Sequence, residues 1–266
     1  MTPSKIFPAA AIISLTSVFC SCQKVIHIDL NSSSPQYVIE GNVTNLGGID
    51  SVKISRSVNF DQDNTFPAVS GAVVTITDSN AGVTDTLREQ MAGMYITTTL
   101  PGIPGHTYKL YIKADNRIFT AASTMPAPVT LDSLYTEVAG AFRKNISLVP
   151  VYTDPAMKGN YYQFYAIVNG AASDAINIRN DNLVNGQVIS QPINIRGIGT
   201  TDISSGDNVT VYLSCIDSAV YQYFFTLKQT ENQNSATPSN PQSNINGGAL
   251  GYFSARTLSY KMIVVP

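Results

Sequence analysis

The stretch Thr107-Tyr-Lys-Leu-Tyr-Ile-Lys-Ala114 alternates between two kinds of side chain. Its even-numbered positions carry Tyr, Leu, Ile and Ala, whereas its odd-numbered positions carry Thr, Lys, Tyr and Lys. Because successive side chains of a strand point to opposite faces, this period of two predicts a strand with one buried and one solvated face. Such strands are typical of antiparallel sheets, so the stretch predicts an all-β fold.

The sequence on either side continues this pattern. Asp115-Asn116 is a turn signal, and a second strand candidate follows it at 117–124. Toward the N-terminus, turn residues separate further short β-type runs at 37–43, 52–58 and 72–77. Several short strands with turns every ~8–12 residues are typical of a β-sandwich. We therefore expect one β-sandwich domain over residues 35–125.

A proline-rich segment interrupts the pattern at residues 126–129. Pro126 and Pro128 cannot donate a backbone hydrogen bond to a sheet, and they favour a stiff, extended connection. We interpret this segment as a linker and expect a second β-rich domain over residues 130–266. Within it, residues 161–168 are apolar on both alternating faces, which predicts a central strand covered on both sides. The predicted architecture is two β-sandwich-like domains in tandem.

The second half also contains a helical pattern. Apolar residues recur from Val220 at the spacing i, i+3, i+4 and i+7, which predicts a short helix near 218–231. Asp217 or Ser218 is suited to cap its N-terminus. A long loop rich in Asn, Ser, Gln and Pro is expected at 232–246.

The N-terminus has the features of a lipoprotein export signal. After Lys5 comes an apolar run of about 14 residues, which is shorter than the ~20 that span a bilayer and fits a secretory signal core. The run ends at Ser21-Cys22, and a small residue directly before a cysteine suits cleavage by lipoprotein signal peptidase. We expect residues 1–21 to be removed, Cys22 to carry the lipid, and residues 22–34 to form a tether.

Two alternatives concern the cysteines. Cys20 follows the bulky Phe19 and so fits a lipoprotein cleavage site less well, and an ordinary secretory signal with incidental cysteines is the other alternative. Cleavage before Cys22 would leave Cys215 with no partner for an intramolecular disulfide. Cys215 continues an alternating apolar face, so we expect a small buried hydrophobic residue there rather than a catalytic thiol.

The charge composition disfavours nucleic acid as a partner. The formal net charge of the 266-residue chain is −2, and only 13% of its residues are charged. Lys and Arg form no basic stripe, which electrostatic attraction to phosphates requires. The 44% of hydrophobic residues are sufficient for a packed core.

No catalytic constellation is apparent. His27 lies in the tether and His106 in a turn, and neither has a nucleophile and carboxylate nearby in sequence. Asp61-Gln-Asp63-Asn64 opens like a calcium loop but lacks its glycine and glutamate, and Asn180-Asp181-Asn182 is more simply a polar turn. We therefore predict no enzyme, no cofactor and no metal. Carboxylates that converge in space and tyrosines that stack on sugars stay open as alternatives.

Several stretches resemble a family of Gram-negative outer-membrane lipoproteins known as domain of unknown function 4249. The resemblance begins at Ser21-Cys-Gln-Lys-Val-Ile-His-Ile-Asp-Leu30 and ends at Ser243-Asn-Ile-Asn-Gly-Gly-Ala-Leu-Gly-Tyr-Phe-Ser-Ala255. The other matching pieces are residues 37–43, 59–60, 65–72, 124–128, 159–162, 215–217 and 219–224. The first domain is also similar to transthyretin-like and carboxypeptidase-regulatory modules, on the steps at 93–95 and 105–110.

This resemblance implies an accessory lipoprotein, encoded beside a TonB-dependent transporter that imports nutrients or siderophores. It implies no enzyme activity, and Cys22 is the functional residue that it carries over. It also implies anchoring in the outer membrane, on the periplasmic face or at the cell surface. Two other functions are weighed against it: a structural or adhesion module at the cell surface and, third, a hydrolase acting on glycans or peptides.

Overall fold

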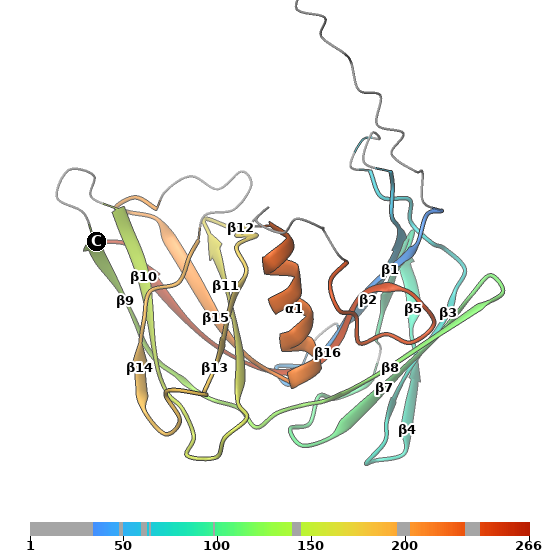
Figure 1. Ribbon diagram of the computed structural model, residues 1–266, viewed down its shortest axis with the longest axis horizontal. Helices are drawn as coiled ribbons and strands as arrows, with labels where there is room; N and C mark the ends of the chain where they lie inside the picture. Colours follow the sequence, from blue (N-terminus) through green and yellow to red (C-terminus); the bar gives the residue numbers. More distant parts are fainter. Residues whose placement is uncertain are drawn as a thin grey trace, which may run out of the picture. The chain divides into compact units, whose positions relative to one another are not determined.

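A computed structural model describes residues 34–47, 50–59, 63, 65–97, 99–139, 145–195, 203–231 and 240–266. These residues form sixteen strands and one helix, and the strands pair in three sheets that are antiparallel except where β1 meets β16 (Figure 1). The prediction of a mostly β protein with one short helix is therefore confirmed. Signal peptide and tether lie outside the described residues, as does most of the predicted polar loop.

The largest sheet has nine strands and runs through both halves of the chain. Its order is β12-β11-β15-β16-β1-β2-β6-β5, with β13 paired to β11. Its strands are β1 (Tyr37–Thr44), β2 (Ser51–Arg56), β5 (Arg88–Met91), β6 (Met94–Ile96), β11 (Tyr161–Val168), β12 (Ala171–Ala172), β13 (Asn177–Asn180), β15 (Asn208–Ile216) and β16 (Leu250–Val264). Consequently, the last strand of the chain lies between a strand of each half.

Two smaller sheets contain the remaining strands. The four-stranded sheet has the order β4-β3-β7-β8, and the three-stranded sheet has the order β14-β10-β9. Their strands are β3 (Val73–Asp78), β4 (Val83–Thr86), β7 (Thr107–Ala114), β8 (Arg117–Thr124), β9 (Leu131–Ala139), β10 (Asn145–Thr153) and β14 (Val188–Ser190). In β7 the even-numbered residues are buried, as the alternation at 107–114 predicts.

Each smaller sheet encloses a separate hydrophobic core with one part of the large sheet. The first core contains side chains of β1, β2, β3, β7 and β8, and the second contains side chains of β10, β11, β14 and β15. Along the sequence the change from one core to the other falls between Met125 and Val129. The predicted linker occupies this position.

The strand β16 belongs to both cores. Phe253 and Ala255 lie in the first core, whereas Val265, just beyond the strand, lies in the second. These residues are all odd-numbered, so the same face of β16 contributes to both cores. The even-numbered residues therefore face the opposite side of the large sheet. Residues 34–266 accordingly form one compact unit.

The pairing of β16 with β1 is parallel and very close. Gly251 stands opposite Ile39 and has a φ of 96°, a region that favours glycine. A Cβ atom on Gly251 would lie 1.9 Å from the carbonyl oxygen of Ile39, which is closer than any real contact. Only glycine fits at this position.

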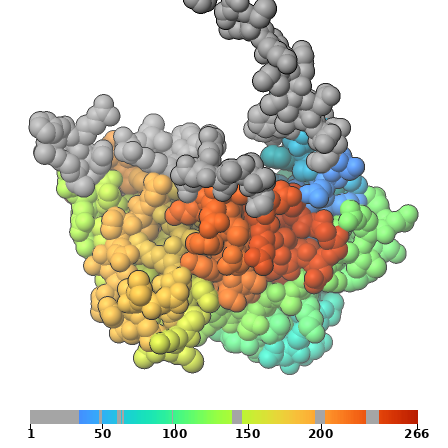
Figure 2. Space-filling view, in the orientation of Figure 1, coloured from blue at the N-terminus to red at the C-terminus, as the bar shows by residue number. Residues whose placement is uncertain are grey.

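The helix α1 (Ser218–Glu231) covers part of the uncovered face of the large sheet. Figure 1 shows it in front of β16, between the two groups of strands. Asp217 caps it, because its carboxylate accepts a 2.9 Å hydrogen bond from the amide of Val220. Val220, Tyr223 and Phe224 form a small third cluster with Ile216, as the helical spacing predicts. The space-filling view shows α1 and the C-terminal residues, orange to red, in the middle of this face (Figure 2).

Candidate functional site

Three tyrosines from different strands form a row on the face of the large sheet that carries α1. Tyr165, Tyr212 and Tyr260 lie directly opposite one another on β11, β15 and β16. The rings of Tyr165 and Tyr212 are stacked, with centroids 4.6 Å apart and planes 6° apart, and Tyr260 lies 5.4 Å from Tyr212. We call these three residues the tyrosine row.

The row arises because more buried and less buried side chains alternate along β11 and along most of β15. On β11 the even-numbered residues Tyr162, Phe164 and Ala166 fill the second core. The odd-numbered side chains therefore face the side of α1, where Tyr161 packs against the helix cluster and both Tyr161 and Tyr165 stay partly exposed. The expectation of a strand covered on both sides is thus met fully on one face of β11 and partly on the other.

Exposed apolar side chains extend the row along β16. Tyr260 is 50% exposed, Met262 73% and Val264 60%, and all three point to the same face. A groove of about 220 Å³ is lined by Met262 and Val264 together with Asn208 and Thr210 of β15. Contiguous apolar surface of this kind is a common feature of binding sites.

Buried polar atoms without hydrogen-bond partners lie on the same face. Among the described residues they include Oγ of Ser214 and Ser254, Oε1 of Gln163 and Nε of Arg256. Each such atom costs about 1–3 kcal/mol unless a partner or water satisfies it. The Arg256 guanidinium also lies 5.9 Å from the ring centre of Tyr165. Because these polar atoms are buried, what the face presents to solvent here is its aromatic surface.

Burial keeps the phenol of Tyr165 neutral. It raises the pKa of Tyr165 above its ordinary value, and the charge of Arg256 opposes this rise only in part. The row presents three aromatic rings, which suits contact with a partner or ligand.

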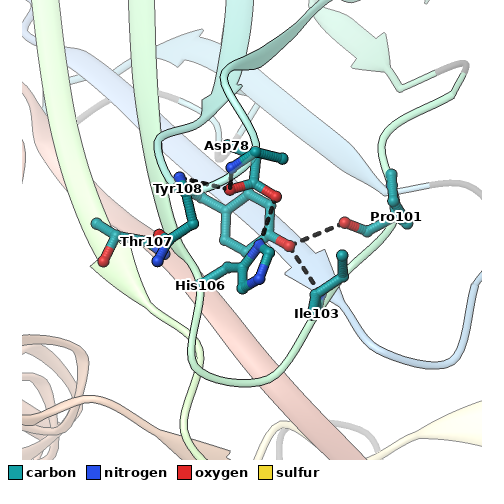
Figure 3. Close-up of polar contacts among 8 residues, drawn as sticks. Asp78, Pro101, Ile103, His106, Thr107 and Tyr108 are labelled. Carbon is teal, nitrogen blue, oxygen red and sulfur yellow. Dashed lines mark hydrogen bonds and ion pairs between the residues drawn. The ribbon is translucent and has the colours of Figure 1, made fainter.

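His106 lies in a turn, as the sequence predicts, and its side chain is partly buried against an aspartate. Its Nδ1 lies 2.7 Å from Oδ2 of Asp78, a carboxylate at the end of β3 that is only 1% exposed (Figure 3). Asp78 also accepts hydrogen bonds from the amides of Asn80 and Ala81. Beside this pair, the hydroxyl of Tyr108 donates to the carbonyl of Pro101. The contact between Asp78 and His106 therefore holds the turn after β3 against the turn before β7.

We expect replacement of Asp78 by asparagine to lower stability in a pH-dependent way. Burial alone would raise the pKa of Asp78, but hydrogen bonds from His106, Ala81 and Asn80 hold it below its ordinary value. The stabilisation by the carboxylate is therefore complete above about pH 4 and is lost as the pH falls through the pKa of the folded state. The D78N variant should lose about 2 kcal/mol at pH 7 and much less at pH 2.5.

Urea denaturation at both pH values measures this difference. The matched control is Asp132→Asn, at an exposed carboxylate whose change should stay within about 0.5 kcal/mol. An equal loss for D78N at both pH values would contradict the role assigned to the charge of Asp78.

Other buried aspartates in the described chain also hold loops. Asp181 accepts hydrogen bonds from the amides of Gly159 and Asn160, so the candidate calcium turn 180–182 uses its carboxylate internally. Asp154 accepts from the hydroxyl of Tyr162 and the amide of Gly186. The hydrogen bonds of both carboxylates therefore serve to hold these loops in place.

The structure places the remaining sequence candidates as follows. Cys215 is 4% exposed in the second core, where burial raises the pKa of its thiol, as expected for a small buried residue. Ser21, Cys22 and His27 lie outside the described residues, as does most of the candidate loop 61–64. Within the described part of the chain, no cluster of three metal-ligating side chains and no helix able to span a membrane is found.

Sequence reasoning did not locate the tyrosine row or Asp78. Tyr165 and Tyr212 stand at alternate positions of two apolar strands, but nothing local shows that these strands pair in register. Asp78 is 28 residues from His106, so their contact leaves no trace in sequence spacing. The sequence feature that could have pointed to the tyrosine row is the large number of tyrosines in the chain.

Comparison with solved structures gives one relative to report. The crystal structure of the chicken interferon gamma receptor alpha chain, in selenomethionine form, matches 69% of this chain and 89% of its own, with 13% identity and a TM-score of 0.22. Among curated proteins no match was found. A sequence model described as "Domain of unknown function (DUF4249)" matches residues 23–260.

Proposed function

Because the chain belongs to the DUF4249 family, we propose that it is a lipid-anchored binding protein of the bacterial outer membrane, without catalytic activity. Its partner is a TonB-dependent nutrient transporter, by the family resemblance stated above. The observation that carries the binding role is the tyrosine row, an exposed aromatic surface on a rigid sheet. Lipid on Cys22 holds this surface beside the membrane.

The composition of the face supports a protein partner. Tyrosine and methionine are enriched at protein interfaces, because they supply large contact areas and few charges. Tyr212, Tyr260 and Met262 fit this description, and the flanking groove provides a recess beside them. Residues at the centre of such patches supply most of the binding energy.

We expect the double variant Tyr212→Ala/Tyr260→Ala to lose its partner while staying folded. Truncation of two central aromatic residues should weaken binding at least ~30-fold, equivalent to about 2 kcal/mol. The cost to the sheet is smaller, roughly 1 kcal/mol for the lost cross-strand contacts. The measurement is co-purification of the lipidated full chain from outer membranes in mild detergent, with mass spectrometry of the recovered proteins.

The matched control is Tyr111→Ala. Tyr111 is 37% exposed on β7, in a different sheet, and its replacement should leave recovery unchanged. Failure of the wild-type protein to recover any outer-membrane transporter would contradict the proposed partner. Equal recovery by the double variant and the control would contradict the tyrosine row as the binding surface.

A further inference from the structure

The strand β16 loses one of its two neighbours partway along its length. It pairs with β15 as far as Val264, but its pairing with β1 ends at Arg256. Figure 1 shows β16 continuing beyond β1 toward the C-terminus. The burial of β16 changes near the same place, because no side chain is exposed from Leu250 to Ser259, whereas four of the next five are exposed. Among the described residues, the last part of β16 is therefore a free edge of the large sheet.

The backbone groups of three residues point toward this free side. The amide of Leu258 donates a 2.6 Å hydrogen bond to Asn45, which directly follows β1, and so points away from β15. At the other end, the amide of Val265 donates to the chain that leads into β15. Because this direction alternates along a strand, the even-numbered residues of 260–264 point away from β15. None of the described residues bonds to their N–H and C=O groups.

This edge lacks the protection that the other edge strands have. Native edge strands are kept from pairing by charges, prolines, bulges, covering chain or short length. The edge strands β4, β5, β12, β13 and β14 have four residues or fewer, and β9 carries Asp132 and Glu137. The edge strand β8 is bridged from Thr120 to Asn246. The free part of β16 has one charge, Lys261, with no proline and no register shift. It is therefore suited to accept a further strand.

We propose that the protein partner adds an extended segment to this edge as a further strand of the large sheet. The free N–H and C=O groups repeat at every second residue, which is the pattern that the main chain of another strand complements. From Leu258 to Val264 the edge spans about 20 Å, which is room for a strand of about six residues. Tyr260 and Met262 lie exposed on one face, so the added segment carries apolar side chains at alternate positions.

This inference rests on the proposed function, because Tyr260 belongs both to the tyrosine row and to the free edge. A strand added beside Tyr260 extends the aromatic surface of the row without a break. Two copies of the chain that paired along this edge alone would join about six residues each, whereas a stable interface involves about 20–30 residues on each side. A partner that covers the tyrosine row and also adds a strand comes closer to that size.

Hydrogen–deuterium exchange of the lipidated full chain in mild detergent, read at single residues, tests whether the edge is free. We expect the amides of Tyr260, Met262 and Val264 to exchange at least ~100-fold faster than those of Lys261 and the other odd-numbered neighbours. In the complex with the transporter, this alternation should disappear because the added strand protects both sets. Equal protection in the free chain, or unchanged fast exchange in the complex, would overturn the proposal.

Variants at Met262 separate the backbone contact from the side-chain contact. Because the amide of Met262 points away from β15, proline at this position removes no internal hydrogen bond, but it blocks pairing along the edge. In co-purification, Met262→Pro should recover at least about tenfold less transporter than Met262→Ala, which loses the same side chain but keeps the amide. The matched control is Val138→Pro on the edge strand β9, where the side chain is 60% exposed and the amide also points away from its neighbour. This control should leave recovery unchanged.

The outcomes distinguish this inference from the proposed function. Equal recovery by Met262→Pro and Met262→Ala would overturn strand addition and leave the proposed function standing. Recovery of no transporter by the wild-type chain would contradict the proposed function, and this inference with it. A wild-type dimer in sedimentation that Met262→Pro abolishes would assign the edge to a second copy of the chain and so overturn the proposal.

Discussion

Among glycine-to-alanine replacements in β16 and the turns next to it, the one at Gly251 is expected to destabilise the protein most. The new Cβ would lie 1.9 Å from the carbonyl oxygen of Ile39, and the φ of 96° is itself strained for alanine. Relief requires separation of β16 from β1, which are the strands that join the two halves of the large sheet. We expect a loss of about 4 kcal/mol or more in the free energy of unfolding.

Urea denaturation followed by circular dichroism measures this loss, and Gly170→Ala is the matched control. Gly170 also has a positive φ, of 85°, but a Cβ there would meet no atom within 4 Å. Its replacement should therefore cost only the backbone strain, roughly 1–2 kcal/mol. If the two variants unfold at the same urea concentration, the proposed close packing of β16 on Ile39 is wrong.

Replacing Cys22 with serine is expected to abolish lipid attachment completely. Lipid attachment requires the thiol sulfur, and serine supplies an oxygen that does not form the thioether. All of the protein should lose labelling by an alkyne analogue of palmitate, and it should keep residues 1–21 because lipoprotein signal peptidase requires the cysteine. One acyl chain alone gives weak anchoring. If all of the wild-type protein stays in the membrane fraction, it therefore carries more than one acyl chain.

The control for this experiment is Cys20→Ser, two residues upstream in the predicted signal. Because cleavage before Cys22 removes Cys20, this variant should keep both the label and the membrane association. If Cys20→Ser loses the label instead, Cys20 carries the lipid and cleavage occurs before it. If the wild-type chain carries no label, its signal is an ordinary secretory signal.

Much of the fold is local and could be predicted. The alternation at 107–114 identifies β7 and its buried face, and the spacing from Val220 identifies α1 together with its cap at Asp217. The short strands β4, β5 and β6 were not predicted, because four residues or fewer give too little alternation to recognise.

The long-range pairings could not be predicted. Val38 pairs with Leu250 in a parallel ladder, and no pattern in either strand indicates that the other strand is its partner. The candidate sites have the same limitation. The stacking of Tyr165 on Tyr212 and the contact of Asp78 with His106 depend on strand register and on turns that meet in space.

The position of β16 also sets a condition on when the protein folds. The first core needs Phe253 and Ala255, which the ribosome makes well after the strands β1 to β8. The amide of Leu258 bonds to Asn45, 213 positions earlier, and closing a loop of this length is slow. The N-terminal half is therefore unable to complete its core until β16 has been made. For a protein exported as proposed above, this order keeps the chain unfolded, and so able to pass through a translocation pore, until β16 arrives.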